Sequence, residues 1–321
     1  MRIKTIYINL FITLVLLSIA CAMDVYAQEE AEEVPAEEFA LEFSEPPRLF
    51  IIPMANTMRS LDLNLSGSAT FATDQFGFSG TGLIGLGDIS QFEISGLTVI
   101  SQIEGEKNEQ RTTPAAGVKF YLPGEDLHKY LPGLAVSFRR TFGGEENELY
   151  TIPNNQYFKV KRQLADLYIV GSKGFSTRNW RGVRVHVGLD FIGSQLSING
   201  NPFKKNFVVP FAGLEVWSTP RAKLMFEYEY LSVMDEQKAA KFVSESSEGI
   251  SEKALDAKAD EIITREWMTM FGVRFFFTQY VTTDVGLRYQ GDFSSVADTN
   301  IEAKIAVTLP LHLAYERVVG Q

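Results

Sequence analysis

Hydrophobic and polar residues alternate along the last long segment of the chain, residues 300–315. Isoleucine, alanine, valine, leucine and tyrosine take the odd positions, whereas glutamate, lysine, threonine and histidine occur among the even ones. A period of two places successive side chains on opposite faces and so predicts a β-strand. The segment is long enough to cross a membrane, which takes about nine to eleven tilted residues. Because unpaired backbone groups are costly in lipid, such a strand requires neighbours that close into a barrel.

Eleven further segments carry this alternation, some of them in a weaker form. They are residues 60–71, 76–86, 91–100, 115–122, 134–142, 163–173, 183–192, 207–217, 222–231, 267–277 and 281–290. Together with the last segment they predict about twelve strands.

The connections between these segments alternate in length. The short ones are residues 87–90, 123–132, 174–182, 218–221 and 278–280. The connections between them, residues 101–114, 143–162, 193–206, 232–266 and 291–299, are longer, with 72–75 as the exception. Short periplasmic turns and longer outer loops are typical of outer-membrane barrels, and an even strand number returns both ends to one side. A soluble β-sandwich has no reason to sort its connections in this way.

The N-terminus has the features of an export signal. Arg2 and Lys4 precede an apolar run, and the small residues around Ala27 fit a cleavage site, so residues 1–27 are interpreted as a signal peptide. Cys21, the only cysteine, leaves a lipidated N-terminus open as an alternative. The glutamate-rich residues 28–58 are predicted to be a flexible periplasmic lead. Their last part, residues 48–58, is apolar without a clear period and fits either the barrel interior or its periplasmic end.

On these features the chain resembles a small bacterial outer-membrane β-barrel protein. The girdles at the two lipid interfaces would be supplied by aromatic residues at strand ends, namely Phe71, Phe142, Trp217, Tyr230, Trp267, Tyr280 and Tyr289. The resemblance implies an all-β fold, a single antiparallel transmembrane barrel over residues 59–315, with a C-terminal tail at 316–321. It also implies the outer membrane of a Gram-negative-type bacterium, contact with lipid and lipopolysaccharide, and insertion by the barrel assembly machinery.

Composition narrows the possible functions. The net charge of −10 argues against nucleic acid as a partner, because phosphates require lysine and arginine clusters. No segment after the N-terminus reaches the roughly eighteen apolar residues of a spanning helix, which excludes a helical membrane protein.

With the apolar face toward lipid, the opposite face of the strands carries charged side chains into the lumen. The candidate lumen-lining residues are Asp62, Glu93, Lys119, Arg139, Arg184, His186, Asp190, Glu215, Glu227, Glu229, Arg274, Asp284, Arg288, Glu302 and Lys304. Two functions remain open for such a lumen. It is either a passive narrow channel for ions or small polar solutes, in which the acidic excess favours cations, or a structural barrel whose paired charges fill the bore.

An outer-membrane enzyme with a site at the barrel mouth or in the lumen is the alternative function. His128 and His312 lie on the periplasmic side, and His186 lies in the middle of a strand near Asp190. No H-E-x-x-H, paired cysteine, G-x-S-x-G or Walker motif occurs in the sequence. The sequence therefore predicts no catalytic, cofactor-binding or metal-binding residues. A secreted soluble β-protein is the third possibility.

The longest connection, residues 232–266, differs from the others. In its second half Leu255, Ala259, Ile262 and Ile263 share one side of a predicted helix. This helix either folds over the mouth and constricts it or belongs to a mobile outer loop. Lys159, Lys161 and Arg162 in another outer connection either contact lipopolysaccharide phosphates or form a solvated strand extension.

Overall fold

The computed structural model describes residues 43–71, 76–102, 109–128, 130–150, 156–177, 180–246, 250–291 and 299–313. An antiparallel sheet of 13 strands dominates the fold. The strands are β1 (Asp62–Phe71), β2 (Phe76–Gly85), β3 (Ser90–Gln102), β4 (Glu109–Leu122), β5 (Gly133–Thr141), β6 (Glu146–Tyr150), β7 (Gln156–Thr177), β8 (Trp180–Ile198), β9 (Asn201–Thr219), β10 (Ala222–Asp235), β11 (Ile263–Thr278), β12 (Val281–Gln290) and β13 (Asn300–Pro310).

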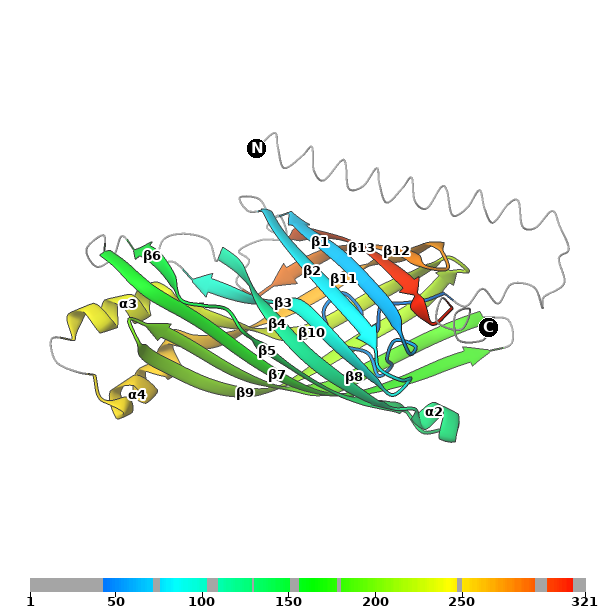
Figure 1. Ribbon diagram of the computed structural model, residues 1–321, viewed down its shortest axis with the longest axis horizontal. Helices are drawn as coiled ribbons and strands as arrows, with labels where there is room; N and C mark the ends of the chain where they lie inside the picture. The colour runs from blue at the N-terminus through cyan, green and yellow to red at the C-terminus, as the bar shows by residue number, and fades with distance from the viewer. Residues whose placement is uncertain are drawn as a thin grey trace, which may run out of the picture.

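The sheet closes on itself through two pairings (Figure 1). The first strand β1 pairs with the last strand β13 along its whole length, and β5 pairs with β7. The short strand β6 pairs with β7 beyond the end of β5, so it continues the line of β5 along the same neighbour. Twelve strands therefore form the ring, which confirms the prediction of one antiparallel all-β barrel of about twelve strands.

The two faces of the barrel wall differ in polarity. Along β5 the outward residues Leu134, Val136 and Phe138 are exposed, whereas Ser137 and Arg139 on the opposite face are buried. The same holds around the ring, where the exposed outward side chains include Leu65, Ile94, Val118, Phe120, Val187, Leu189, Val208, Phe226, Phe271, Ile305 and Val307. Apolar residues outside and charged residues inside are the reverse of what a water-soluble protein shows.

Three neighbouring strands extend the barrel wall on one side. β7 has 22 residues and β8 and β9 have 19 each, far more than a membrane crossing requires. The prediction that residues 193–206 form a loop is wrong, because the alternation continues through the buried residues Leu196, Ile198 and Phe203. Asn199 and Gly200, both with positive φ, make the two-residue turn between β8 and β9.

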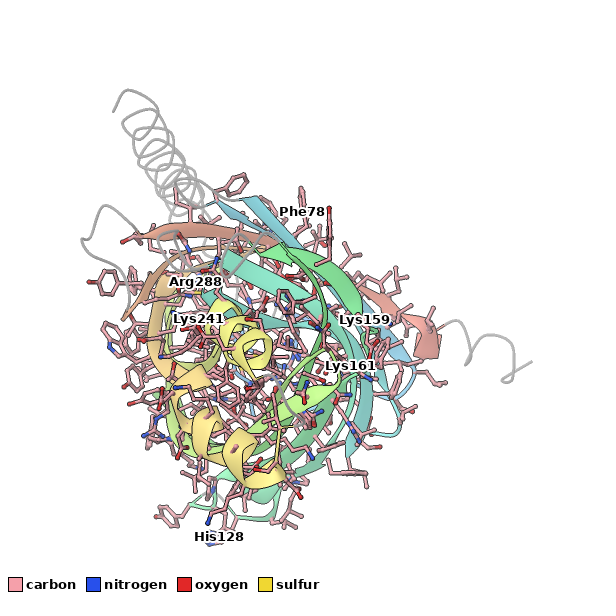
Figure 2. All side chains as sticks on the ribbon, turned by 90° about the vertical axis from the view of Figure 1, so that its left-hand side faces the viewer. Phe78, His128, Lys159, Lys161, Lys241 and Arg288 are labelled. Atoms are coloured by element: carbon pink, nitrogen blue, oxygen red, sulfur yellow. The ribbon has the colours of Figure 1, made fainter. Side chains whose placement is uncertain are left out.

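Two helices cover this extended end of the barrel, which we call the cap end (Figures 1 and 2). They are α3 (Glu236–Glu245) and α4 (Glu252–Ile262), and both belong to the connection between β10 and β11. The Ser251 side chain caps α4 by accepting the Ala254 N–H, and Leu255, Ala259 and Ile262 are buried. This confirms the predicted apolar side of α4 for these three residues, whereas Ile263, predicted to share it, is the first residue of β11. The helix α3 was not predicted. None of the described helices is long and apolar enough to span a membrane.

The opposite end of the barrel carries short connections, and we call it the vestibule end. Two of them, between β9 and β10 and between β11 and β12, are tight turns, and a third contains the one-turn helix α2 (Gly124–Leu127). The connections at the vestibule end are on average shorter than those at the cap end, as the sequence predicts. At the cap end, part of the additional length forms strand and helix.

Candidate functional site: the plugged lumen

The N-terminal part of the described chain, residues 43–58, lies inside the barrel (Figure 1) and is called the plug here. Leu49 and Ile52 are completely buried, and Met54 and Ala55 nearly so. The predicted flexible lead at 28–58 therefore does not extend through the plug. Of the two positions open for residues 48–58, the barrel interior is the one observed, and residues 28–42 lie outside the described part of the chain.

Two cations of the barrel wall donate hydrogen bonds to the plug backbone. Lys119 Nζ lies 2.9 Å from the Pro47 carbonyl and 3.2 Å from the Met54 carbonyl. Arg274 Nη2 lies 3.1 Å and 3.0 Å from the carbonyls of Arg48 and Leu49. Irregular backbone buried away from water needs such partners, since an unmade hydrogen bond there is costly. The wall thus supplies the donors that no sheet neighbour provides.

Two wall residues accept hydrogen bonds from plug N–H groups. The Glu227 carboxylate accepts from Ile51 at 3.1 Å and from Ile52 at 3.2 Å, and Ser172 Oγ accepts from Ala55 at 2.8 Å. These contacts come from strands β10 and β7, whereas the donors come from β4 and β11. The plug is therefore held from several sides of the ring.

Glycines in the wall make room for the apolar plug side chains. A Cβ at Gly213 would lie 2.4 Å from Leu49 Cδ1 and 2.9 Å from Ile52 Cδ1, and one at Gly286 would lie 2.9 Å from Phe50 Cζ. Any larger residue at these positions must displace the plug, because interiors pack without spare volume.

Ion pairs fill much of the remaining interior. Arg48 of the plug binds Glu93 at 2.5 Å, Arg139 binds Asp166 at 3.1 Å, and Arg274 binds Asp284 at 2.7 Å. Lys223 lies 2.9 Å from Glu215 and also contacts Glu45 of the plug. Arg288 binds Glu302 at 2.6 Å. Charges buried in this way require partners.

The structure places the candidate lumen residues as follows. Asp62, Glu93, Lys119, Arg139, His186, Asp190, Glu215, Glu227, Glu229, Arg274, Asp284, Arg288 and Glu302 are buried within the barrel, and Lys304 is partly buried among them. The side chain of Arg184 is 41% exposed at the vestibule end, where it pairs with Glu125 at 3.5 Å. The candidate set lacks Lys223 and Arg48. Lys223 has the same strand parity as Glu227 and Glu229, so the alternation was sufficient to find it, whereas Arg48 has no periodic signal.

His186 contacts a serine and lies near an acid, and the plug packs against this group of side chains. Its Nδ1 lies 2.6 Å from Ser172 Oγ and its Nε2 lies 3.8 Å from Glu215. His186 is completely buried, and the Ser172 hydroxyl is already engaged by the plug residue Ala55. The three side chains therefore form part of the plug anchor in this structure. Within the described ranges, no group of three or more acidic, histidine or cysteine residues is placed to hold a metal ion.

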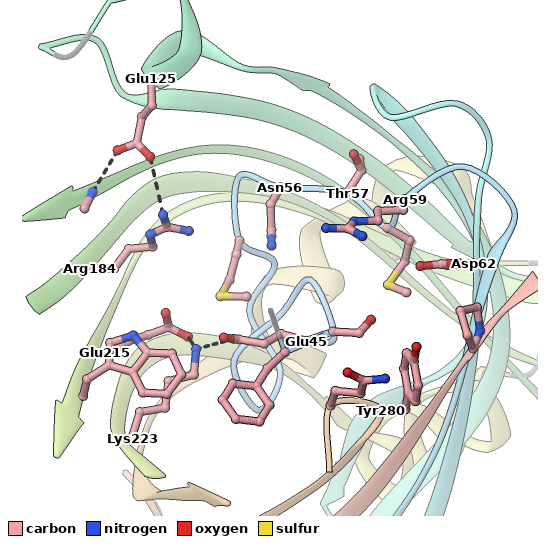
Figure 3. Close-up of a pocket in the computed structure, with 18 of the residues that line it drawn as sticks. Glu45, Asn56, Thr57, Arg59, Asp62, Glu125, Arg184, Glu215, Lys223 and Tyr280 are labelled. Carbon is pink, nitrogen blue, oxygen red and sulfur yellow. Dashed lines mark hydrogen bonds and ion pairs between the residues drawn. The ribbon is translucent and has the colours of Figure 1, made fainter. Parts of the chain in front are cut away.

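The plug leaves a wide cavity at the vestibule end (Figure 3). Its volume is about 850 Å³, and its charged lining includes Arg59, Asp62, Glu125, Arg184 and Lys223. Figure 3 shows Glu125 bound to Arg184 on one wall and Lys223 placed between Glu215 and Glu45 on another. A second cavity of about 130 Å³ lies on the other side of the plug and touches Arg48, Phe50 and Ile51.

An apolar core and one ion cluster hold the helices at the cap end. Phe158, Leu196 and Phe203 of the extended strands are buried together with Leu255 and Ile262 of α4. Arg162 of β7 binds Glu236 of α3 and Glu148 of β6, each at 2.5 Å. Arg162, assigned from the sequence to an outer surface, is thus turned inward to hold the cap, while Lys159 lies on the exposed side of the same strand.

Leu255→Ala is expected to loosen the cap. Removing a buried leucine side chain costs about 2–5 kcal/mol, and α4 is attached to the barrel mainly by its apolar side. Hydrogen exchange of the α4 amides should accelerate by at least about tenfold, whereas exchange in the barrel strands should stay unchanged. Lys253→Ala, on the exposed side of the same helix, is the matched control. Equal protection of α4 in both variants would contradict this account of the cap.

The comparisons with known proteins come from solved structures. No family model and no curated protein matches the sequence. The translocator domain of the autotransporter NalP from Neisseria meningitidis is similar with 12% identity, a TM-score of 0.44, and coverage of 77% of this chain and 86% of that one. The NanC porin is similar with 9% identity, a TM-score of 0.43, and coverage of 78% and 100%.

The outer membrane protein Omp33 of Acinetobacter baumannii is similar with 12% identity and a TM-score of 0.35, and the alignment covers 78% of this chain and all of that one. The first of these is described as a translocator domain, the second as a porin and the third as an outer membrane protein. The assignment of this chain to the barrel fold rests on its own strand pairing, which closes the ring through β1 with β13 and β5 with β7.

Proposed function

We propose that this chain is an outer-membrane β-barrel protein whose passage is closed at rest by its own N-terminal plug. The apolar outer face and the charged interior support the membrane location, because only hydrocarbon around the barrel makes that polarity favourable. The short connections at the vestibule end support a periplasmic position for that end, with the cap end outside the cell.

The observation that carries the closed state is the hydrogen bonding between wall and plug. Lys119, Glu227 and Arg274 bind plug backbone groups that have no sheet partner, so the plug is specifically held and does not merely occupy free volume. Of the two functions that the sequence left open, this favours the filled lumen in the resting protein. Passage of ions or small polar solutes then requires the plug to move.

Fractionation tests the location. The mature protein should be recovered with outer membranes and released only by detergent, because its outer face would otherwise expose a continuous apolar surface to water. Recovery in the soluble fraction without detergent would overturn the proposal. Outer-membrane proteins of known position in the same preparation are the control.

Conductance of purified full-length protein in planar bilayers tests the closed state. We expect no steady current from the native chain and intermittent current from Gly213→Leu, because the new side chain overlaps Leu49 and Ile52 and pushes the plug from the wall. Gly171→Leu is the matched control, since a Cβ there meets Leu134 Cδ2 at 3.6 Å, an ordinary contact, on the outer face. A steady current from the native chain would contradict the proposal.

A further inference from the structure

The barrel wall has a seam between β2 and β3 toward the cap end. β1 pairs with β2 from Leu63 with Ile84 to Phe71 with Phe76. In contrast, β3 pairs with β2 only from Gln91 with Gly85 to Ser95 with Thr81. The outer half of β2 therefore extends beyond its pairing with β3.

The strand β3 leaves the wall because it crosses the mouth of the barrel. Its end, from Ile100 to Gln102, pairs in parallel with Val233–Asp235 of β10, which lies across the ring. β4 stays paired with β3 along this path. The β3–β4 hairpin thus bends inward as a pair, and the seam is the consequence of this bend.

The cavity of about 130 Å³ above the plug lies behind this seam. Its lining includes Gly77 and Ser79 on the inner face of β2 and Gly96 and Thr112 on the β3–β4 side. It also includes Phe78, whose side chain is 70% exposed on the outer face of the barrel (Figure 2). The lining therefore extends from the interior to the part of β2 that has no β3 partner.

The inner wall of the cavity carries two carboxylates, Asp190, which is hydrogen-bonded to Tyr168, and Glu229. Arg139 and Arg288, which also line it, are paired with Asp166 and Glu302. For Asp190 and Glu229, by contrast, no ion pair is found within the described ranges, and Asp190 Oδ1 and Glu229 Oε1 accept no hydrogen bond. Both residues are only 3% exposed. Buried carboxylate oxygens without a donor are unfavourable, so this wall is complementary to a ligand with a positive charge and N–H donors.

Part of the remaining lining is apolar, at the place where the plug and the strands meet, and the other part consists of polar and charged side chains, Lys304 among them. Phe50 and Ile51 of the plug form one side, and Ile192 and Leu231 of the wall form another. A ligand for this cavity therefore combines a small apolar body with a cationic head.

We infer that the cavity behind the β2–β3 seam binds a small molecule with an apolar body and a primary ammonium group, which enters laterally from the outer leaflet. The apolar body partitions into the membrane, passes Phe78 and Gly77, and places its ammonium group between Asp190 and Glu229. The inference rests on the membrane location in the proposed function and does not depend on movement of the plug.

Equilibrium dialysis of radiolabelled phenethylamine tests the site, with full-length protein in nanodiscs of zwitterionic lipid and empty nanodiscs as the blank. We expect saturable binding of one equivalent. 2-Phenylethanol and 3-phenylpropanoate, which keep the apolar body without the positive charge, should compete at least about tenfold more weakly, because neither supplies a charged donor. Equal competition by all three compounds would overturn the inference.

Substitutions separate the head group from the entrance. The double variant Asp190→Asn and Glu229→Gln keeps the side-chain shapes and should weaken phenethylamine binding at least about tenfold while leaving 2-phenylethanol binding unchanged. Gly77→Leu should block the entrance, because a Cβ at this position meets nothing closer than Thr70 Cβ at 3.9 Å and the larger side chain extends into the cavity. Gly80→Leu is the matched control on the lipid side of the same strand, where the nearest atom is 3.8 Å away.

Full binding by both Gly77→Leu and the double carboxylate variant would overturn the inference, provided that each variant shows the heat-modifiable gel mobility of a folded barrel. If the double variant fails this folding check, the Gly77→Leu and Gly80→Leu pair decides alone. If the native chain carries no steady current and does not bind the amine, the inference about this site is wrong and the proposed closed state stands. If the native chain carries a steady current and still binds the amine, the proposed closed state is wrong and the inference about this site stands.

Discussion

A chain lacking residues 43–58 is expected to carry a steady ionic current in planar bilayers, in contrast to the silent full-length protein. Without the plug, Lys119, Glu227 and Arg274 lose their backbone partners and become hydrated, and the space of Leu49, Phe50 and Ile52 fills with water. Closure of the ring by β1 with β13 involves no plug residue, so the barrel should still form.

The current through this deletion variant should be cation-selective. Buried carboxylates outnumber buried cations on the strands, and they include Asp62, Glu93, Asp166, Asp190, Glu215, Glu227, Glu229, Asp284 and Glu302. Acidic residues along a narrow path attract cations and repel anions. The reversal potential under a salt gradient measures this preference, and adding Glu227→Gln and Glu229→Gln should reduce it.

Two results would contradict the account of the plug. One is a folded deletion variant that carries no current, which would mean that the cap alone seals the barrel. The other is a current that prefers anions. Correct folding is checked by heat-modifiable gel mobility, because an unfolded chain would also carry no current.

Arg274→Met is expected to be the most destabilising single substitution in the lumen. The completely buried guanidinium binds Asp284 through two nitrogens, at 2.7 and 2.8 Å, and also holds two plug carbonyls. Removing one partner of a buried pair costs about 3–5 kcal/mol, because the other charge is left without compensation. The loss should appear as a lower urea midpoint for unfolding in detergent micelles.

The double variant Arg274→Met and Asp284→Leu should regain part of the lost stability, since it leaves neither charge unpaired. Thr283→Val is the control, because Thr283 is adjacent to Asp284 on the opposite face of β12. If Arg274→Met and the control unfold at the same urea concentration, the Arg274 pair contributes nothing to stability and its assigned role is wrong.

The barrel itself could be predicted because its cause is local. A period of two, repeated in segment after segment, fixes which face of each strand meets apolar surroundings, and the order of short and long connections fixes which ends lie together. The buried positions of Glu227, Arg274 and Asp284 follow from the same parity. The β8–β9 extension was predictable in principle, since Asn199 and Gly200 are a hairpin signal between alternating residues.

The sequence by itself thus determined the strands, the polarity of the wall and most of the charged interior, because each depends on neighbours along one strand. Only the tertiary structure decided that the plug fills the lumen, that β3 crosses the mouth to β10, and that Asp190 and Glu229 form no ion pair within the described part of the chain. These features depend on contacts between segments far apart in the chain, such as Ile51 with Glu227 or Arg48 with Glu93. Such contacts leave no periodic pattern in the sequence, because the plug forms no helix or strand and its backbone groups bind individual side chains of the wall.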